Sequence, residues 1–355
     1  MLHIAFSLSA DFPPNIYDEA HTMKIYVDDG STNIKLAWVE DGKVKTFMSP
    51  NSFKREWSMR FGESQGVENY EIEGEQFAYD TQAADAEVTT DTRYQYSRVN
   101  TVAIHHALHA SGIKPQPVDI TVTLPLSEFL TSGNTPNDAN IARKKSSVKR
   151  AVDAQGATNF VVGHVNVLPE SIPAGFVKLG QLTEDEALLI VDLGGTTLDV
   201  SQVKGQMSGI TMTYCDPKIG VSMVTDGIRD VMAGAARTRI SPLTADKLLI
   251  SYEGDAALLT TRIFDATQRA AVVERIKQQE SVLGHRVSDA LERFSGYTHV
   301  MCVGGGANIQ AVIDAVKQAT QVPADRFFVS GNAQYDLVLG MLNMNEEIND
   351  ENAEG

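Results

Sequence analysis

The sequence predicts an α/β protein built from two domains. The chain has 355 residues, of which 43% are hydrophobic and 21% are charged, and a chain of this size usually buries two separate cores. Strand-like segments that end in glycine-rich turns alternate with segments of helical periodicity. One strand–turn–strand pattern occurs twice, with its aspartates at positions 28 and 192, 164 residues apart, which is the length of a domain.

The second copy of this pattern is residues 188–200, LLIVDLGGTTLDV. An apolar strand ends at Asp192, two glycines let the backbone turn and point its N–H groups into one small space, and two threonines add hydroxyl donors. A carboxylate for a hydrated metal ion beside bare amides and hydroxyls indicates a site for nucleotide phosphates. Taken alone, the segment fits an ordinary Gly-Gly hairpin equally well.

The first copy is residues 27–36, VDDGSTNIKL. Val, Asp, Gly and Thr coincide with the second copy at four of the ten positions, and both copies follow the same plan of strand, aspartate, glycine turn, hydroxyls and alternating strand. Two such loops that face each other can hold a polyphosphate from both sides. The pattern argues against a Walker-type site, whose glycine loop opens a helix and carries Gly-Lys-Ser/Thr.

The two ends of the chain differ from the rest. Residues 1–22 have no sustained period, and a clear strand begins only at Met23, so we expect a dispensable, poorly ordered extension. Residues 346–355 are acidic, and we expect a frayed tail there.

Charge and composition exclude several classes of function. The formal net charge is −16, and such a surface repels nucleic acid and anionic membranes, so we expect a partner protein to make any contact with DNA. No apolar run reaches the ~18–20 residues of a membrane-spanning helix, and we expect no secretory signal. Cys215 and Cys302 lie in or beside apolar segments, which predicts buried, reduced thiols in a cytosolic protein.

The predicted helix at residues 101–110 carries His105, His106 and His109. His105 and His109 stand one turn apart, which is a spacing that can chelate zinc. No third ligand is nearby, so a solvated helix face is the favoured interpretation.

A second basic cluster lies on the predicted helix at residues 137–152. We expect the helix to display five basic side chains, either as a solvated face or as a contact surface for an acidic neighbour. They are Arg143, Lys144, Lys145, Lys149 and Arg150.

A carboxylate follows the predicted strand at residues 161–168. Glu170 stands between two prolines that stiffen the backbone, which is a suitable position from which to orient a water molecule. From spacing alone, a glutamate at the start of a helix is the favoured interpretation.

The last third of the chain predicts helices at residues 225–236, 244–250 and 270–294, followed by a strand at 297–303. Three glycines, at positions 304 to 306, lie between that strand and a helix that begins near Asn308. Such a turn offers a close-approach surface for a flat or anionic group, although a purely structural turn is the alternative.

In this order, these motifs resemble the superfamily of actin, sugar-kinase and heat-shock-chaperone ATPases. The two hairpins correspond to its phosphate-1 and phosphate-2 loops, and the three glycines to its adenosine loop. Within the superfamily, the chain is similar to the ParM (StbA) family of plasmid-segregation actin-like proteins from about Met23 to Leu342. The segments that carry this similarity are VDDGSTNIKL at 27–36, SPNSFKREW at 49–57, PESIPAG at 169–175 and FSGYTHVM at 294–301.

The resemblance implies a set of site residues. Asp28 and Asp192 would hold Mg²⁺ through its waters, and Lys35 would reach the phosphates. Glu170 would polarise the attacking water, so the resemblance reverses the interpretation of this residue as the start of a helix. Contacts to the base would come from helices of the second domain, which carry no readable motif. The remaining implied contacts to the nucleotide are Gly30, Ser31, Thr32 and Asn33, then Gly194, Gly195, Thr196 and Thr197, and finally Gly304, Gly305 and Gly306.

The implied fold is actin-like, with two domains that are each built on a duplicated, ribonuclease H-like mixed β-sheet flanked by helices. The nucleotide would lie in the cleft between them. The first domain would span residues 23–178, with residues 321–345 returning to it, and the second would span residues 179–320.

The implied function is that of an ATPase that binds ATP, with GTP left open, and Mg²⁺. It would polymerise into filaments that hydrolysis of the γ-phosphate destabilises, and a centromere-binding adaptor protein would link the filaments to plasmid DNA in the bacterial cytoplasm. A small-molecule kinase and a non-polymerising nucleotide switch of the same superfamily are the alternatives. The sequence offers no unassigned catalytic base for the first and no room for a further substrate-binding domain for the second.

Overall fold

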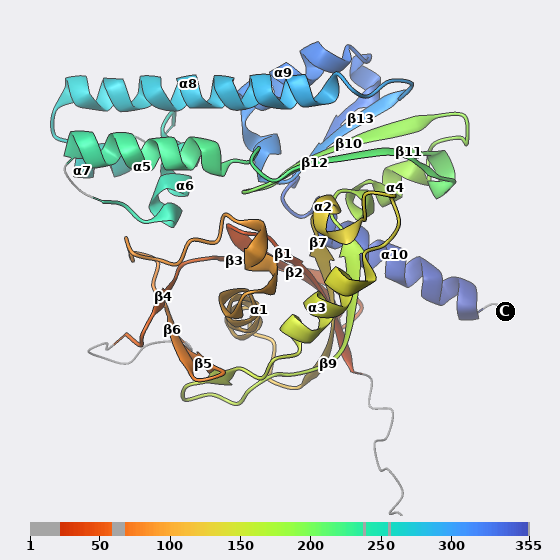
Figure 1. Ribbon diagram of the computed structural model, residues 1–355, viewed down its shortest axis with the longest axis horizontal. Coiled ribbons are helices and arrows are strands. Elements are labelled where there is room, and N and C mark those ends of the chain that lie inside the picture. The colour runs from red at the N-terminus through yellow and green to blue at the C-terminus, as the bar shows by residue number, and fades with distance from the viewer. Residues whose placement is uncertain (1–21, 59–67, 237–238, 255–256, 354–355) are drawn as a thin grey trace, which may run out of the picture.

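The computed structural model describes residues 22–58, 68–236, 239–254 and 257–353. The predicted extension therefore lies outside the described residues, apart from Thr22. Two mixed five-stranded sheets, a smaller four-stranded sheet and surrounding helices make up this part of the chain (Figure 1). The predicted α/β class, with mixed sheets flanked by helices, is confirmed.

The first large sheet has the strand order β3-β2-β1-β7-β9. β1 to β3 form an antiparallel meander, whereas β7 and β9 run parallel to β1. Parallel strands need crossover connections, and α1 and α3 lie in these crossovers. The bounds are β1 Met23–Asp29, β2 Asn33–Glu40, β3 Lys43–Pro50, β7 Pro117–Leu124, β9 Val161–Pro169, α1 Arg98–Ala110, α2 Leu126–Phe129 and α3 Asp138–Val148.

The second large sheet repeats this plan strand for strand, with the order β12-β11-β10-β13-β14. β10 to β12 are antiparallel, and β13 and β14 run parallel to β10. The long helix α8 packs against α5 and α9 beside this sheet (Figure 1). The bounds are β10 Ala187–Leu193, β11 Leu198–Lys204, β12 Ile210–Asp216, β13 His299–Val303, β14 Phe327–Val329, α5 Ser222–Ala236, α6 Pro242–Ser251, α7 Ala257–Arg262, α8 Ala266–Leu291 and α9 Gln310–Thr320.

The four-stranded sheet has the order β4-β6-β5-β8 and lies beside α1 (Figure 1). Each large sheet and its helices enclose a separate hydrophobic core, as expected for a chain of this length. The remaining bounds are β4 Phe53–Arg55, β5 Asn69–Ile72, β6 Glu75–Tyr79, β8 Asp153–Ala154, η1 Thr92–Tyr96, η2 Ile172–Gly175, α4 Phe176–Leu179, η3 Gly205–Met207, η4 Gly305–Asn308, η5 Ala324–Arg326 and α10 Asp336–Ala353.

The segment at residues 321–345 divides between the two halves. β14 extends the second sheet beside β13, whereas α10 packs on the first sheet, where Met341 and Leu342 share a hydrophobic cluster with Tyr26. This segment therefore contributes one strand to the second sheet and one helix to the first, and the expected domain bounds stay a prediction. α10 continues to Ala353, so the described residues of the acidic tail are helical, where we expected a frayed end. None of the described helices is long and apolar enough to cross a membrane.

The three histidines of α1 do not form the predicted solvated face. His105 and His106 are buried, and His109 is half-buried. The cause is a second layer: the four-stranded sheet covers the side of α1 that faces away from the first large sheet, and the ring of His106 stacks on Tyr79 with 3.9 Å between centroids. Helical periodicity gives no sign of such a layer.

Lys144 on α3 is also buried, although we expected this helix to display it at the surface. It points inward to Asp29 at the end of β1. The other four basic residues of the cluster are at least partly exposed, and a contact surface for an acidic neighbour stays a prediction for them.

Burial of His105 predicts a pH-dependent loss of stability. Burial and the nearby His109 lower the pKa of His105 from about 6.5 to about 4, so the unfolded chain binds more protons between these values. The contribution of His105 to the free energy of unfolding should fall by up to ~1.4 kcal/mol per pH unit as the pH drops from 6.5 towards 4.

Urea unfolding of the parent and His105→Leu at pH 7, 6 and 5 measures this contribution. The variant should lose less stability than the parent on acidification, and the exposed His285→Leu serves as the matched control. Equal pH dependence in the parent and His105→Leu would contradict the assignment.

Candidate nucleotide site

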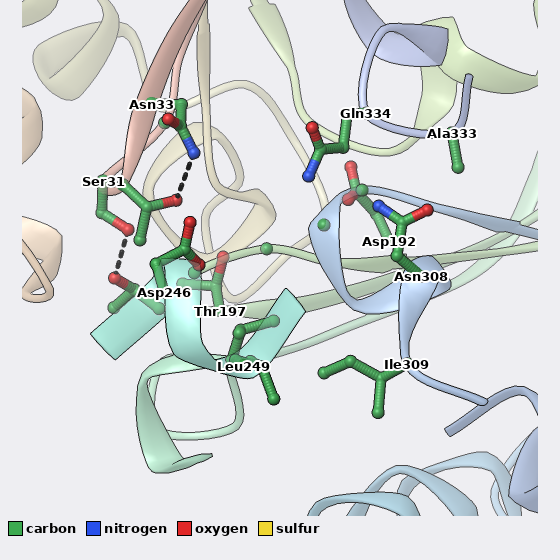
Figure 2. A pocket seen from close by; sticks show the side chains of 18 of the residues that line it. Ser31, Asn33, Asp192, Thr197, Asp246, Leu249, Asn308, Ile309, Ala333 and Gln334 are labelled. Carbon is green, nitrogen blue, oxygen red and sulfur yellow. Dashed lines mark hydrogen bonds between the residues drawn. The ribbon is translucent and has the colours of Figure 1, made fainter. Parts of the chain in front are cut away.

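A cavity of about 550 Å³ lies where the two predicted hairpin turns meet (Figure 2). Sites for small molecules and cofactors commonly have this volume. The cavity is lined by every predicted site residue except Gly306: Asp28, Gly30, Ser31, Thr32, Asn33, Lys35, Glu170, Asp192, Gly194, Gly195, Thr196, Thr197, Gly304 and Gly305.

The first turn presents a fixed ion pair to the cavity. Asp28, one residue before the end of β1, lies directly opposite Lys35 of β2, and the Lys35 Nζ lies 2.6 Å from the Asp28 Oδ2. Burial alone would lower the pKa of Lys35, but the carboxylates of Asp28, Asp192 and Glu170 raise it above its ordinary value. A charged ammonium therefore faces the cavity.

The second turn places another carboxylate in the equivalent position. Asp192 pairs with Asp199 across β10 and β11, as Asp28 pairs with Lys35 in the first sheet. Burial, together with the charges of Asp199 and Asp28, raises the pKa of Asp192 to about 8. The turn itself is tight, since the Gly194 N–H donates to the carbonyl of Thr197 at 2.9 Å.

The two turns are in direct contact across the cavity. The Thr196 hydroxyl donates to the Ser31 hydroxyl at 2.7 Å, although the two residues are 165 positions apart (Figure 2). A Cβ atom added to Gly195 would lie 2.6 Å from the Thr32 Cγ2, so this approach needs glycine. The structure thus brings together the two loops that the sequence pattern predicts to face each other.

Glu170 reaches the cavity through an unusual backbone turn. Its N–H donates to the Leu124 carbonyl at 2.8 Å, and Ser171, with φ of 71° and ψ of −62°, closes a γ-turn in which the Ile172 N–H donates to the Glu170 carbonyl. The glutamate side chain therefore lines the cavity and does not cap η2. Burial and the surrounding carboxylates, Asp199 first, raise the pKa of Glu170 well above its usual range.

The glycines after β13 have two different roles. Gly304 has a φ of +81°, and a Cβ atom there would lie 2.5 Å from the Asp192 Oδ1, so the turn needs glycine at this position. Gly306 lies beneath the cavity wall, where an added Cβ would lie 2.2 Å from the Leu193 Cδ2. Gly304 and Gly305 therefore form the surface, and Gly306 allows the packing that supports it.

The other end of the cavity is formed by residues that sequence reasoning did not single out. They come from α6, α8 and the segments beside α9 and α10, and they combine apolar with charged side chains (Figure 2). The resemblance placed the base contacts on helices of this half without naming residues. The main members of this wall are Asp246, Leu249, Tyr252, Lys277, Glu280, Asn308, Ile309 and Gln334.

Asn51 holds the back of the first turn. The sequence marks this residue only as part of the segment 49–57 that carries the family resemblance, and it predicts no role for it. The Asn51 side chain donates to the carbonyls of Gly30 and Ser31, at 2.9 Å each, and to the Tyr94 hydroxyl at 2.8 Å. Carbonyls that are held from behind leave the N–H groups of the turn available to the cavity.

The carboxylates of the cavity suit a Mg²⁺ ion that is bound through water molecules. Within the described part of the chain, no group of three or more His, Cys, Asp and Glu side chains could hold a metal ion. Asp28 and Asp192 nevertheless face the same cavity, and the charge of Asp28 contributes to the raised pKa of Asp192. Two carboxylates with space for waters and phosphate oxygens match the preference of Mg²⁺ for retained waters.

Two family models together match almost the whole chain. One is described as the N-terminal part of the plasmid segregation protein ParM and matches residues 23–181, and the other is described as its C-terminal part and matches residues 182–344. No curated protein sequence matches the chain.

Solved structures show the same fold. An archaeal actin homologue, Ta0583, in complex with ADP has a TM-score of 0.67 at 17% identity, covering 92% of this chain and 100% of its own. A non-polymerisable quadruple mutant of pCBH ParM has a TM-score of 0.67 at 13% identity, with the same coverage. A 15-stranded ParM filament from Clostridium botulinum has a TM-score of 0.66 at 14% identity, covering 92% of this chain and 99% of its own. The expected actin-like fold is therefore confirmed.

The packing role of Gly306 can be tested with one methyl group. Gly306→Ala should lower the free energy of unfolding by ~1–3 kcal/mol, because the added Cβ overlaps the buried Leu193 side chain. Urea unfolding measures the change, and Gly209→Ala, where an added Cβ meets no atom within 4 Å, is the control. Equal stability of the two variants would refute the proposed close packing.

Proposed function

This chain belongs to the plasmid segregation protein ParM family, and from this premise we propose that it is an actin-like ATPase that binds Mg·ATP in the cavity. The observation that carries the proposal is the contact of the two glycine turns, with Ser31 and Thr196 joined at 2.7 Å. Amides and hydroxyls from two separate sheets surround one small volume, which suits a chain of phosphates. A solved structure of similar fold contains ADP, which agrees with a nucleotide as the ligand.

We propose that hydrolysis proceeds by in-line attack of water on the γ-phosphorus. Glu170, whose side chain lines the cavity, orients the water and serves as the general base that accepts a proton from it. The ammonium of Lys35, with the N–H groups and hydroxyls of both turns, offsets the charge on the transferred phosphoryl group. When bound, Mg²⁺ near Asp28 and Asp192 neutralises phosphate charge.

We further propose that the ATP-bound chain assembles into filaments and that hydrolysis weakens them. Family membership and the similarity to a subunit of a ParM filament support this proposal. A net charge of −16 disfavours direct binding to DNA, so a centromere-binding adaptor protein would connect the filament to a plasmid in the bacterial cytoplasm. The proposal leaves GTP open as a second nucleotide.

Sedimentation of the purified chain tests the filament proposal. Mg·ATP and a non-hydrolysable ATP analogue should drive the protein into the pellet, and the analogue should keep it there longest, whereas Mg·ADP should leave most of it in the supernatant. Failure to pellet with any nucleotide, over a range of protein and salt concentrations, would exclude the filament and favour the kinase or the nucleotide switch.

Substitution of Glu170 tests the hydrolysis step. Glu170→Ala should reduce ATP turnover by about 10²–10⁴-fold, the usual contribution of a general acid or base, while it binds Mg·ATP and still assembles. Phosphate release measures turnover, and the exposed Glu184→Ala is the matched control. Unchanged turnover in Glu170→Ala would show that another group handles the water.

A further inference from the structure

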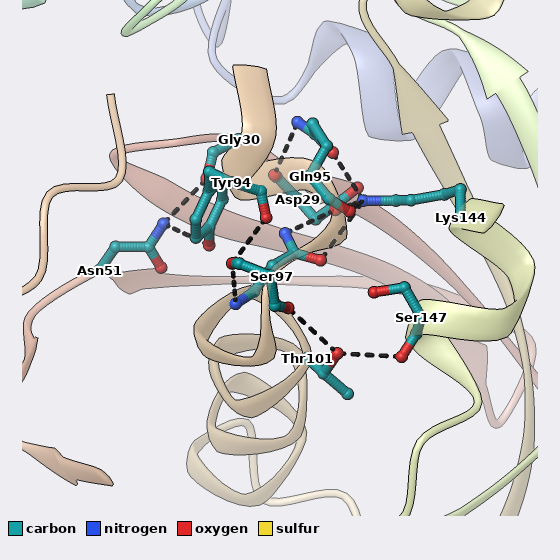
Figure 3. Close-up of polar contacts among 10 residues, drawn as sticks. Asp29, Gly30, Asn51, Tyr94, Gln95, Ser97, Thr101, Lys144 and Ser147 are labelled. Carbon is teal, nitrogen blue, oxygen red and sulfur yellow. Dashed lines mark hydrogen bonds and ion pairs between the residues drawn. The ribbon is translucent and has the colours of Figure 1, made fainter. Parts of the chain in front are cut away.

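Lys144 reaches from α3 to the back of the first phosphate turn (Figure 3). The residue is fully buried, and its ammonium forms an ion pair with the Oδ2 of Asp29. The same Nζ donates to the backbone carbonyl of Gln95 at 2.9 Å and to its side-chain Oε1 at 2.6 Å. One cation thus joins α3, η1 and the end of β1.

Asp29 and Gln95 transmit this contact to the cavity. Asp29 lies between Asp28 and Gly30, which both line the cavity, and Gln95 lines the cavity itself, whereas Lys144 does not. The Asp29 Oδ2 also accepts from the Asn100 side chain at 2.8 Å, while its Oδ1 has no hydrogen-bond partner among the described residues. The anchorage of this carboxylate therefore depends on a single oxygen.

Stability does not explain why a lysine occupies this position. The desolvation of two buried charges offsets most of their attraction, and well-packed apolar side chains are often as stable as a buried ion pair. An ion pair does, however, fix the direction of its partners more narrowly than apolar contacts do. The phosphate turn needs its amides in fixed directions, so this property of the pair is useful at this position.

We propose that Lys144 is a positioning residue for the nucleotide: its buried ammonium holds Asp29 and Gln95 and thereby keeps the turn at residues 28–33 in the conformation that binds phosphates. The inference rests on the proposed binding of Mg·ATP. It gives a function to one member of the basic cluster on α3, and it links that helix to the nucleotide without any direct contact to it.

The test measures nucleotide affinity and stability separately. Calorimetry gives the Kd for AMP and the Kd for Mg·ATP, and the ratio of the first to the second shows how much of the affinity comes from the phosphates. Urea unfolding gives the stability. Three variants are compared with the parent: Lys144→Met, the double variant Asp29→Asn/Lys144→Met, and Lys149→Met, an exposed lysine at the end of the same helix.

Lys144→Met should be less stable than the parent, because Asp29 is left charged and buried without its cation. The double variant carries neither charge, so it should regain stability. Its ratio of the Kd for AMP to the Kd for Mg·ATP should nevertheless stay about tenfold or more below that of the parent, because this is the loss expected when hydrogen bonds to the phosphates are misplaced. Lys149→Met should match the parent in both measurements.

Recovery of both the stability and the ratio in the double variant would overturn the proposal, because it would show that Lys144 only neutralises a buried charge. The double variant decides this question even if Lys144→Met does not fold. A parent chain that does not bind Mg·ATP would contradict the proposed function itself, which is a distinct outcome.

Discussion

Negative charge is concentrated where the two large sheets meet, and the organisation of the cleft depends on how that charge is balanced. Asp28, Asp192 and Glu170 line one cavity, and burial and mutual repulsion raise the pKa of the last two. Lys35 and Lys144 each pair with a carboxylate of the first turn, one inside the cavity and one behind its wall. The carboxylates that remain suit a ligand that brings its own divalent cation, as Mg·ATP does.

The repetition of one sheet plan explains how this charge is gathered. Asp28 and Asp192 each lie one residue before the end of the central strand of a five-stranded sheet, and the glycine turns that follow touch through Ser31 and Thr196. A ligand held by both turns is necessarily sensitive to how the two sheets lie relative to each other. If the chain binds ATP and assembles as proposed, this dependence offers a physical route from the presence of the γ-phosphate to the shape of the subunit, and so to the contacts between subunits.

The sequence predicts the duplicated turns well, because glycine, aspartate and threonine at fixed spacing carry both the backbone geometry and the chemistry. It predicts burial on helices less well. Periodicity marks the side of α1 that faces the first sheet, but it gives no sign of the second layer that packs on His106, or that the Lys144 side chain points inward. Only the family resemblance suggests a role for Glu170 at this cavity, because a γ-turn at Ser171 leaves no pattern in residue spacing; the role itself stays a proposal. The residues of α6 and α8 that line the cavity could not be predicted from the sequence either, because their mixture of apolar and charged side chains is usual for any amphipathic helix.

We infer that the two turns act as one phosphate clamp across the cleft. A crystal structure with Mg²⁺ and a non-hydrolysable ATP analogue would show whether they do. We expect the β- and γ-phosphates between the turns at residues 30–33 and 194–197, with the metal ion facing Asp28 and Asp192 through water. Phosphates bound to one turn alone, or a nucleotide bound outside this cavity, would contradict it.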